Sequence, residues 1–232
     1  MSPSLREQAR TALVTGANRG LGLAVAAELY SRGHRVLLAA RDKDAATEAA
    51  ERLGPYAVPL VLDVTDQASV DRAAGHAGAV DILVNNAGVQ LDWGETPSAI
   101  GLDAVRHTLD VNLLGAWRMV RALVPGMVGR GWGRVVNVSS GAASFAYGPA
   151  AQCPAYSASK AALNALTVML AKETEGTGVL VNSVNPGLVR TRMRPDAERT
   201  AEEAAVTVAD AAALPEGGPS GVFLRAGGTM PW

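Results

Sequence analysis

The chain has 232 residues, of which 48% are hydrophobic and 19% are charged, so it can bury a sizeable core. Its formal net charge is −1 and it has no long run of Lys or Arg, which excludes the electrostatic pattern of a protein that binds nucleic acid or an anionic membrane. We therefore expect a small-molecule partner and one domain spanning residues 1–232.

The chain contains one cysteine, Cys153, which excludes an internal disulfide framework and is typical of a reducing compartment. Residues 1–10 carry charges and lack the apolar segment of an export signal, and no apolar run is long enough to span a membrane. We expect a cytoplasmic protein. The N-x-S pattern at Asn137 lies inside an apolar run, so we interpret it as chance.

Short runs rich in β-branched residues and leucine alternate along the chain with Ala-rich stretches that have helical spacing. The predicted strands are Ala12–Thr15, Arg35–Ala40, Val58–Leu62, Ile82–Val84, Arg134–Val138, Val179–Val184 and Gly221–Leu224. The predicted helices are Leu21–Ser31, Ala45–Leu53, Gln67–Ala74, Leu102–Val128, Tyr156–Thr174 and Ala201–Ala213. This alternation predicts an α/β, doubly wound Rossmann fold with a seven-stranded parallel sheet and helices on both faces.

In such a sheet the ligand crevice lies outside the carboxyl ends of the strands, so functional residues are expected directly after them. Three glycines, Gly16, Gly20 and Gly22, follow the first strand and open the first helix. Glycine there permits a sharp turn and a close approach of backbone N–H groups to a diphosphate. Their spacing differs from the usual G-x-G-x-x-G, and a plain glycine-rich turn is the alternative.

The residues after the second predicted strand bear on which dinucleotide is bound. An acidic residue there would accept hydrogen bonds from the ribose 2′-hydroxyl of NAD, but the chain reads Ala40-Arg41-Asp42. Arg41 and Arg19 can offer guanidinium groups to a 2′-phosphate, which favours NADPH/NADP+. The alternatives are that both arginines are solvated surface cations, and that Asp42 pairs with Arg41 or faces a ribose. The tail Arg225–Trp232 is rich in Gly and Pro and is expected to be irregular.

A set of further motifs follows in order along the chain. They are Thr15-Gly16-x-x-x-Gly20-x-Gly22, Asp63-Val64, Asn85-Asn86-Ala87-Gly88, Asn112, Ser140, Tyr156-Ser157-Ala158-Ser159-Lys160 and Asn185-Pro186-Gly187. Together they resemble the short-chain dehydrogenase/reductase family, from about Thr11 to Trp232. The glycine turn, Ala40-Arg41-Asp42 and the Pro231-Trp232 ending look most like the NADPH-dependent carbonyl reductases of that family.

Tyr156 and Lys160 are one helical turn apart and share a helix face, where an ammonium group would favour the phenolate and bring the phenol pKa toward neutrality. The resemblance implies that Tyr156 is a general acid and that Lys160 tunes it and holds the nicotinamide ribose. It assigns Ser140 to orienting the carbonyl, in preference to Ser139. It implies that Asn112 supports a water-linked proton relay to Lys160.

The resemblance also implies a cofactor site, in which Asp63 and Val64 meet adenine and Asn86 and Gly88 border the nicotinamide. The full predicted set is Gly16, Asn18, Arg19, Gly20, Leu21, Gly22, Arg41, Asp63, Val64, Asn86, Ala87, Gly88, Tyr156, Lys160, Pro186, Gly187, Val189 and Thr191. No metal is expected, because His34, His76 and His107 are scattered without ligand spacing and suit surface or hydrogen-bonded positions.

The substrate end of the site is expected to be walled by the stretch between Ser140 and Tyr156, including Phe145 and Tyr147. Trp93 and Met193 are further candidate walls, with plain packing as the alternative. Cys153 lies near Tyr156 in the sequence, and an inert thiol is the simpler interpretation. The short segment from Leu188 to about Ala201 predicts a small cover over an open cleft that accepts bulky carbonyl compounds.

These observations favour an NADPH-dependent oxidoreductase that reduces a ketone or aldehyde to an alcohol. The alternatives are an NAD-dependent alcohol dehydrogenase and a non-catalytic dinucleotide sensor, and the intact set of Asn112, Ser140, Tyr156 and Lys160 argues against the sensor. A homodimer or homotetramer is expected, with contacts through the Leu102–Val128 and Tyr156–Thr174 helices.

Overall fold

The computed structural model describes residues 9–232. Its strands are β1 (Thr11–Thr15), β2 (Arg35–Ala40), β3 (Ala57–Val61), β4 (Ile82–Asn85), β5 (Gly133–Val138), β6 (Val179–Val184), β7 (Phe223–Arg225) and β8 (Gly228–Thr229). Its α-helices are α2 (Gly20–Ser31), α3 (Lys43–Leu53), α4 (Gln67–Ala77), α5 (Leu102–Leu109), α6 (Gly115–Gly129), α7 (Pro154–Glu173) and α8 (Ala201–Ala212). Within the described residues, no helix combines the length and hydrophobicity needed to cross a bilayer.

The strands form one sheet in the order β3-β2-β1-β4-β5-β6-β7-β8. Strands β1 to β7 are parallel, as the sequence predicts, so the α/β, doubly wound Rossmann fold is confirmed. The strand count needs one correction, because β8 pairs antiparallel with β7 within the tail that was expected to be irregular. Gly227 and Gly228 both have positive φ, which permits the tight turn between these two strands.

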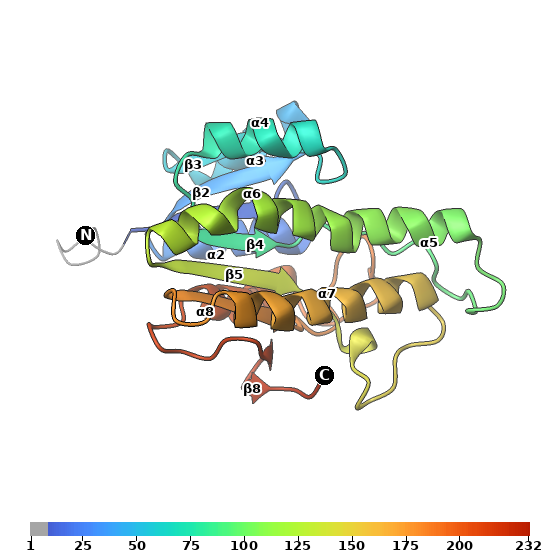
Figure 1. Ribbon diagram of the computed structural model, residues 1–232. Coiled ribbons are helices and arrows are strands. Elements are labelled where there is room, and N and C mark those ends of the chain that lie inside the picture. The colour runs from blue at the N-terminus through green and yellow to red at the C-terminus, as the bar shows by residue number, and fades with distance from the viewer. Residues whose placement is uncertain (1–8) are drawn as a thin grey trace.

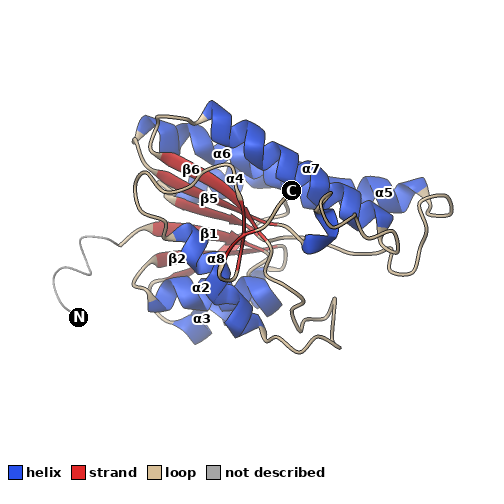
Figure 2. Ribbon diagram, turned by 90° about the horizontal axis from the view of Figure 1, so that it is seen from below, coloured by secondary structure: helices blue, strands red, loops and turns tan. Residues whose placement is uncertain are grey.

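Helices cover both faces of the sheet. Helices α4, α6 and α7 lie in front of it in Figure 1, and Figure 2 shows α2, α3 and α8 on the opposite side. Successive strand residues point to opposite faces, so Leu13 of β1 packs in the core under α4, α6 and α7. Its neighbours Ala12 and Val14 pack in the core under α2, α3 and α8.

The helix predicted over Leu102–Val128 is interrupted by a π-helical segment, Asp110–Leu114, between α5 and α6. In Figure 1 the three segments follow one another along a single course that extends past the carboxyl ends of the strands. π-helical turns often occur at functional sites. Asn112 lies at the middle of this one.

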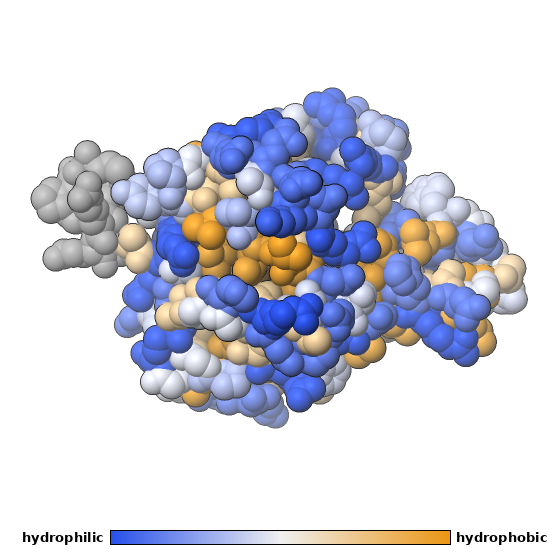
Figure 3. All heavy atoms as spheres, turned by 90° about the horizontal axis from the view of Figure 1, so that it is seen from above, coloured by the Kyte–Doolittle hydropathy of each residue, from blue (hydrophilic) through white to orange (hydrophobic). Residues whose placement is uncertain are grey.

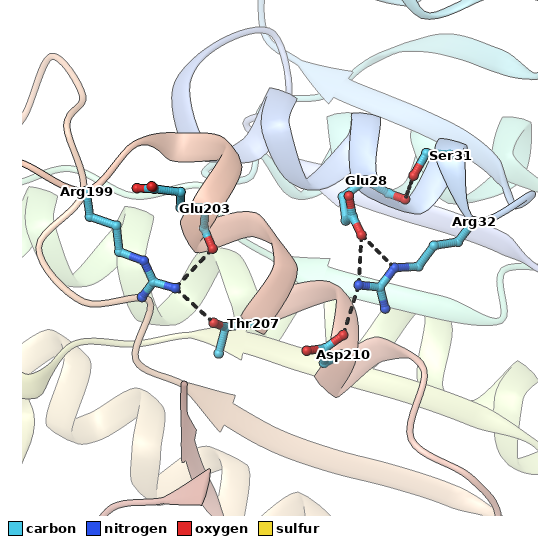
Figure 4. A network of polar contacts seen from close by, with 7 residues as sticks. All are labelled: Glu28, Ser31, Arg32, Arg199, Glu203, Thr207 and Asp210. Atoms are coloured by element: carbon cyan, nitrogen blue, oxygen red, sulfur yellow. Dashed lines mark hydrogen bonds and ion pairs between the residues drawn. The ribbon is translucent and has the colours of Figure 1, made fainter. Parts of the chain in front are cut away.

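Helices α2 and α8 pack against each other behind the sheet, and polar contacts at their margins add to this apolar packing (Figure 4). Arg32, the C-cap residue of α2, pairs with Glu28 at 2.8 Å and with Asp210 of α8 at 2.9 Å. Arg199 donates to the Glu203 carbonyl at 3.0 Å and to the Thr207 hydroxyl at 3.3 Å. Partly exposed pairs of this kind contribute at most about 1 kcal/mol each, so the buried apolar residues provide most of the stability.

The β3 edge of the sheet faces the viewer in Figure 3, where hydrophobic residues form a band between α3 and α4. Val61 in this strand is half-exposed, and the strand pairs on one side only, with β2. Pro59 lies at the centre of the strand and has no N–H group to offer another chain. It therefore limits edge-to-edge pairing with a second sheet.

Candidate active site

A cleft of about 910 Å³ opens at the carboxyl ends of the parallel strands. It is lined by every residue of the predicted cofactor set: Gly16, Asn18, Arg19, Gly20, Leu21, Gly22, Arg41, Asp63, Val64, Asn86, Ala87, Gly88, Tyr156, Lys160, Pro186, Gly187, Val189 and Thr191. Ser140 lines it as well, whereas Asn112 does not. The structure thus gathers into one place residues that are spread over most of the chain.

The glycine turn between β1 and α2 has a backbone that only glycine fits. Gly16 and Gly20 have φ of +64° and +54°. A Cβ at Gly22 would lie 2.3 Å from the Gly16 carbonyl oxygen and 2.4 Å from Nδ2 of Asn86. At the N-cap of α2, Arg19 makes no side-chain capping hydrogen bond, so the first N–H groups of the helix remain available to an anion in the cleft.

The end of β2 presents a positive charge to the cleft. Arg41 and Arg19 are exposed, line the cleft and form no ion pair with another of the described residues. Asp42 points its carboxylate at α3, where Oδ1 accepts a hydrogen bond from the Ala45 N–H at 2.9 Å. Asp42 is therefore the N-cap of α3 and, among the described residues, forms no ion pair with Arg41, while the alternative in which it faces a ribose stays open.

The turns after β1 and β4 are joined by hydrogen bonds. The Thr15 hydroxyl accepts from the N–H groups of Asn86 and Ala87, both at 3.0 Å. The Asn86 side chain in turn donates to the carbonyls of Thr15 at 2.9 Å and Gly16 at 3.3 Å. On the other side of the cleft, Thr65 donates two hydrogen bonds to Asp63, which lower the pKa of Asp63 below its usual value.

Ser140 and Ser139 follow β5 and have different surroundings. The Ser139 hydroxyl is buried and donates to the Lys160 carbonyl at 3.4 Å. Ser140 caps the short 3₁₀ turn Gly141–Ala143, and its hydroxyl is near enough to the Tyr156 phenol to lower the pKa of that phenol. This arrangement agrees with the alternation of side chains along a strand, and it gives Ser140 the position beside the phenol.

Tyr156 and Lys160 lie on the first turns of α7, and both side chains reach the cleft. The Lys160 ammonium group is 5.8 Å from the centre of the Tyr156 ring and donates to the Val138 carbonyl at 2.7 Å. Burial raises the pKa of Tyr156 to about 12, an effect opposed by the neighbouring Ser140 hydroxyl. Burial also lowers the pKa of Lys160 to about 8.

The expectation that Lys160 brings the Tyr156 pKa toward neutrality is therefore wrong for this structure. Removing both groups from water disfavours the phenolate and the ammonium alike, so desolvation raises the pKa of Tyr156 and lowers that of Lys160. At neutral pH the phenol keeps its proton and most Lys160 side chains keep their charge.

Asn112 is buried, and its side chain makes three hydrogen bonds. Its Oδ1 accepts from the Val89 N–H at 2.8 Å, and its Nδ2 donates to the Val89 carbonyl at 2.9 Å and to the Ser159 hydroxyl at 3.0 Å. The side chain thus fixes the segment after β4 against α7. The water-linked relay to Lys160 stays a prediction.

The substrate end of the cleft differs in part from expectation. Trp93, Met193 and the buried Cys153 line it, as predicted. The stretch between Ser140 and Tyr156 lines the cleft as expected, through Gly141, Ala142, Gly148, Ala150, Gln152 and Cys153. Within it, Phe145 and Tyr147 do not line the cleft and are 74% and 61% exposed, so their assignment as pocket walls is wrong. The Ser144 hydroxyl donates to the Pro231 carbonyl, and the Ala146 N–H donates to the Trp232 carbonyl. These hydrogen bonds hold this part of the loop against the C-terminal segment.

Sequence reasoning missed two polar residues that line the cleft, Gln90 and His107, and did not single out Gln152, Arg192 and Arg194 within the segments expected at the site. His107 is exposed, as expected, and α5 also brings it to the rim of the cleft. Arg194 stacks over the Trp93 ring at 4.7 Å and pairs with Asp196, so the cover segment contacts the opposite wall. Asn137 is fully buried, which agrees with a chance N-x-S pattern.

A family model described as short chain dehydrogenase matches residues 10–202, which is most of the chain. Together with the parallel sheet and the cleft at its carboxyl edge, this match shows that the chain belongs to the short-chain dehydrogenase family of oxidoreductases. The family indicated by the sequence motifs is confirmed.

Among its relatives, a 3-oxoacyl-[acyl-carrier-protein] reductase of Vibrio harveyi is 36% identical over 190 residues, which cover 80% of this chain and 76% of that protein. A rhamnolipids biosynthesis 3-oxoacyl-[acyl-carrier-protein] reductase of Pseudomonas aeruginosa is 34% identical over 229 residues, or 94% and 86% of the two chains. The solved structure of an NADPH-bound carbonyl reductase from chicken fatty liver superimposes with a TM-score of 0.84 at 29% identity, covering 97% of this chain and 99% of that one.

Proposed function

We propose that the protein reduces a ketone or an aldehyde to an alcohol with NADPH. The observation that carries this proposal is the content of one cleft. Ser140, Tyr156 and Lys160 lie in the same cleft as the open start of α2 and the two arginines, Arg19 and Arg41. Such a cleft suits a long ligand that has a reactive end and an anionic end.

The residues present fit NADPH. The glycine turn and the first N–H groups of α2 would hold the diphosphate, and Arg19 and Arg41 would hold the 2′-phosphate. The turn after β4, together with Lys160 and the Pro186–Thr191 segment, would hold the nicotinamide end. When bound, NADPH supplies the hydride for the reaction.

Ser140 and Tyr156 would bind the substrate carbonyl oxygen through their hydroxyl groups. Because the pKa of Tyr156 is about 12, the phenol holds its proton at neutral pH and can give it to the alkoxide, which is a stronger base. The Lys160 ammonium group would then stabilise the phenolate that remains. A high phenol pKa favours reduction over alcohol oxidation at neutral pH, since oxidation needs the phenolate as its base.

A second candidate narrows the substrate to a 3-oxoacyl thioester. Its support is the printed function of the Vibrio harveyi and Pseudomonas aeruginosa relatives, which are 3-oxoacyl-[acyl-carrier-protein] reductases. The carbonyl chemistry is the same in both candidates. The two candidates differ in the length of substrate that the mouth of the cleft, beside Trp93 and Met193, must accept.

The test measures the oxidation of NADPH and of NADH with a panel of simple ketones, aldehydes and short 3-oxoacyl thioesters. We expect turnover with NADPH, and we expect Tyr156→Phe to lower kcat at least about 100-fold, because it removes the general acid. The NADPH affinity of Tyr156→Phe should stay within about twofold of wild type. Equal, slow cofactor consumption by both proteins would favour the non-catalytic sensor, and a preference for NADH would favour the NAD-dependent alcohol dehydrogenase.

We also propose that the chain forms a homodimer or homotetramer through α6 and α7. These helices lie on the same face of the sheet (Figure 1) and expose large apolar side chains, namely Leu114 beside the start of α6, Trp117, Val168 and Met169. Exposed apolar side chains grouped on one helical face are typical of an interface between subunits.

A further inference from the structure

Asp92 is a buried carboxylate that the reaction described above does not use. It lies in the loop between β4 and α5, is fully buried and takes part in none of the ion pairs found among residues 9–232. Its Oδ2 accepts hydrogen bonds from the N–H groups of Ala155 at 2.6 Å and Tyr156 at 3.1 Å. Burying a carboxylate is costly, so a specific interaction must hold this one in place.

That interaction is the start of α7. The residue at its N-cap, Cys153, makes no capping hydrogen bond with its side chain, and Pro154 occupies the first helical position. Asp92 reaches the next two N–H groups, those of Ala155 and Tyr156, from 63 and 64 positions earlier in the chain. A negative charge at a helix N-terminus is favourable, so Asp92 acts as the cap that α7 lacks locally.

The main chain of Tyr156 is held on both sides by this arrangement. Its N–H donates to Asp92, and its carbonyl accepts a hydrogen bond from the Ser159 hydroxyl at 2.7 Å. Ser159 accepts in turn from the side chain of Asn112, which also holds both backbone groups of Val89. The segment from residue 89 to residue 92 and the first turn of α7 are therefore parts of one hydrogen-bonded unit.

A further contact joins the residues that adjoin these two segments. The Gly94 N–H donates to the Gln152 carbonyl at 2.8 Å, on the side of Asp92 away from Val89. Trp93, between Asp92 and Gly94, lines the substrate end of the cleft. The wall of the cleft and the first turn of α7 are thus connected through Asp92 and its neighbours.

We propose that Asp92 is a positioning residue for Tyr156, which fixes the phenol relative to the cleft by capping α7. The inference rests on the proposed function, because it concerns how the general acid of that reaction is held. A phenol carried on a helical turn moves when that turn frays. A displacement of about 1 Å at a reacting group can lower a rate about 100-fold.

The experiment compares Asp92→Ala with Asp92→Asn and with a matched control, Asp66→Ala. Asp66 caps α4 through the N–H groups of Ala68 and Ser69, at 3.0 and 3.1 Å, and does not line the cleft. We expect Asp92→Ala to lower kcat about 10- to 100-fold with less than about a threefold change in the KM for NADPH. Asp92→Asn keeps an acceptor and should restore most of kcat, and Asp66→Ala should leave kcat unchanged.

Amide hydrogen exchange supplies a readout that does not depend on activity. The N–H groups of Ala155 and Tyr156 should exchange at least about tenfold faster in Asp92→Ala than in wild type, and those of α4 should not. The proposal is overturned by unchanged exchange at these amides, by a kcat within twofold of wild type, or by an equal loss of kcat in Asp66→Ala. If Asp92→Ala does not fold, Asp92→Ser, with its shorter acceptor, takes its place in the same comparison.

The two proposals fail in different ways. If wild type reduces none of the carbonyl compounds, the proposed function fails, and the exchange rates still decide whether Asp92 holds the first turn of α7. If wild type is active and Asp92→Ala is equally active, the positioning role fails alone.

Discussion

Gly22 offers a sharp test of how the glycine turn is built, because local and tertiary effects predict opposite signs for Gly22→Ala. The residue lies inside α2, where alanine is favoured over glycine by about 1 kcal/mol. An alanine Cβ would however lie 2.3 Å from the Gly16 carbonyl oxygen and 2.4 Å from Nδ2 of Asn86. The neighbours would have to move about 1 Å to reach ordinary contact distance.

Both neighbours are held in place, which makes this movement costly. Asn86 donates to the carbonyls of Thr15 and Gly16, so displacing it breaks the hydrogen bonds between the turns after β1 and β4. Overpacking of this kind costs about 1–3 kcal/mol, and each lost hydrogen bond adds about 1 kcal/mol. After subtracting the helix preference, we expect Gly22→Ala to lower the free energy of unfolding by about 2–4 kcal/mol.

The same shift should weaken cofactor binding. If the displaced turn loses one or two hydrogen bonds to the diphosphate, each about 1.5–3 kcal/mol when the acceptor is charged, the Kd for NADPH rises at least about tenfold. The assays are urea unfolding and titration of NADPH by its fluorescence.

Gly75→Ala in α4 is the matched control, since a Cβ there meets no atom within 4 Å. It should raise the free energy of unfolding by about 0.5–1 kcal/mol and leave NADPH binding unchanged. If Gly22→Ala is as stable as Gly75→Ala and binds NADPH like wild type, the close approach described for Gly22 is wrong.

Three further predictions test separate parts of the proposed function. Arg41→Asp should weaken NADPH binding relative to NADH binding at least about tenfold, because it replaces a cation by a charge that repels the 2′-phosphate. An unchanged ratio of the two Kd values would show that Arg41 is not part of the phosphate site. The reductive kcat should fall as pH rises through about 8, because Lys160 loses its proton there while Tyr156, with a pKa of about 12, keeps its own. The residual activity of Lys160→Arg should not decline at alkaline pH, because the guanidinium group stays charged. If the decline persists in this variant, it arises from a group other than Lys160. Met169→Glu places a charge on the exposed face of α7 and should shift the protein toward monomers in sedimentation or size-exclusion measurements. Val61→Glu, on the β3 edge, is the control and should leave the oligomeric state unchanged. Equal behaviour of the two variants would contradict the proposed interface.

Local sequence patterns predicted most of the framework. Apolar runs bounded by turn residues marked all seven parallel strands, and helical spacing marked the helices to within a few residues at their ends. These features depend on short windows of the chain, because strand and helix periodicity are set by local backbone geometry. The two-residue strand β8 has no such window and was missed.

The residues around the cleft could be predicted for the same reason where they follow strands directly. In a parallel sheet all carboxyl ends meet at one edge, so Gly16, Asn86 and Ser140 were placed together without knowledge of the tertiary structure. The prediction that Phe145 and Tyr147 line the cleft was wrong, because neither residue directly follows a strand. They lie in a loop whose direction is set by contacts with the chain near Pro231, which no local pattern reports.

What the sequence alone determined about this protein is its doubly wound sheet, its family, and the set of groups that line the cleft. Only the tertiary structure decided that burial raises the pKa of Tyr156, that the Asn112 side chain is committed to Val89 and Ser159, and that Asp92 caps α7 from a distant loop. The physical reason is the range of the interactions involved. Periodicity and turn geometry act between near neighbours in the chain, whereas desolvation and long-range hydrogen bonds depend on segments that meet only after folding.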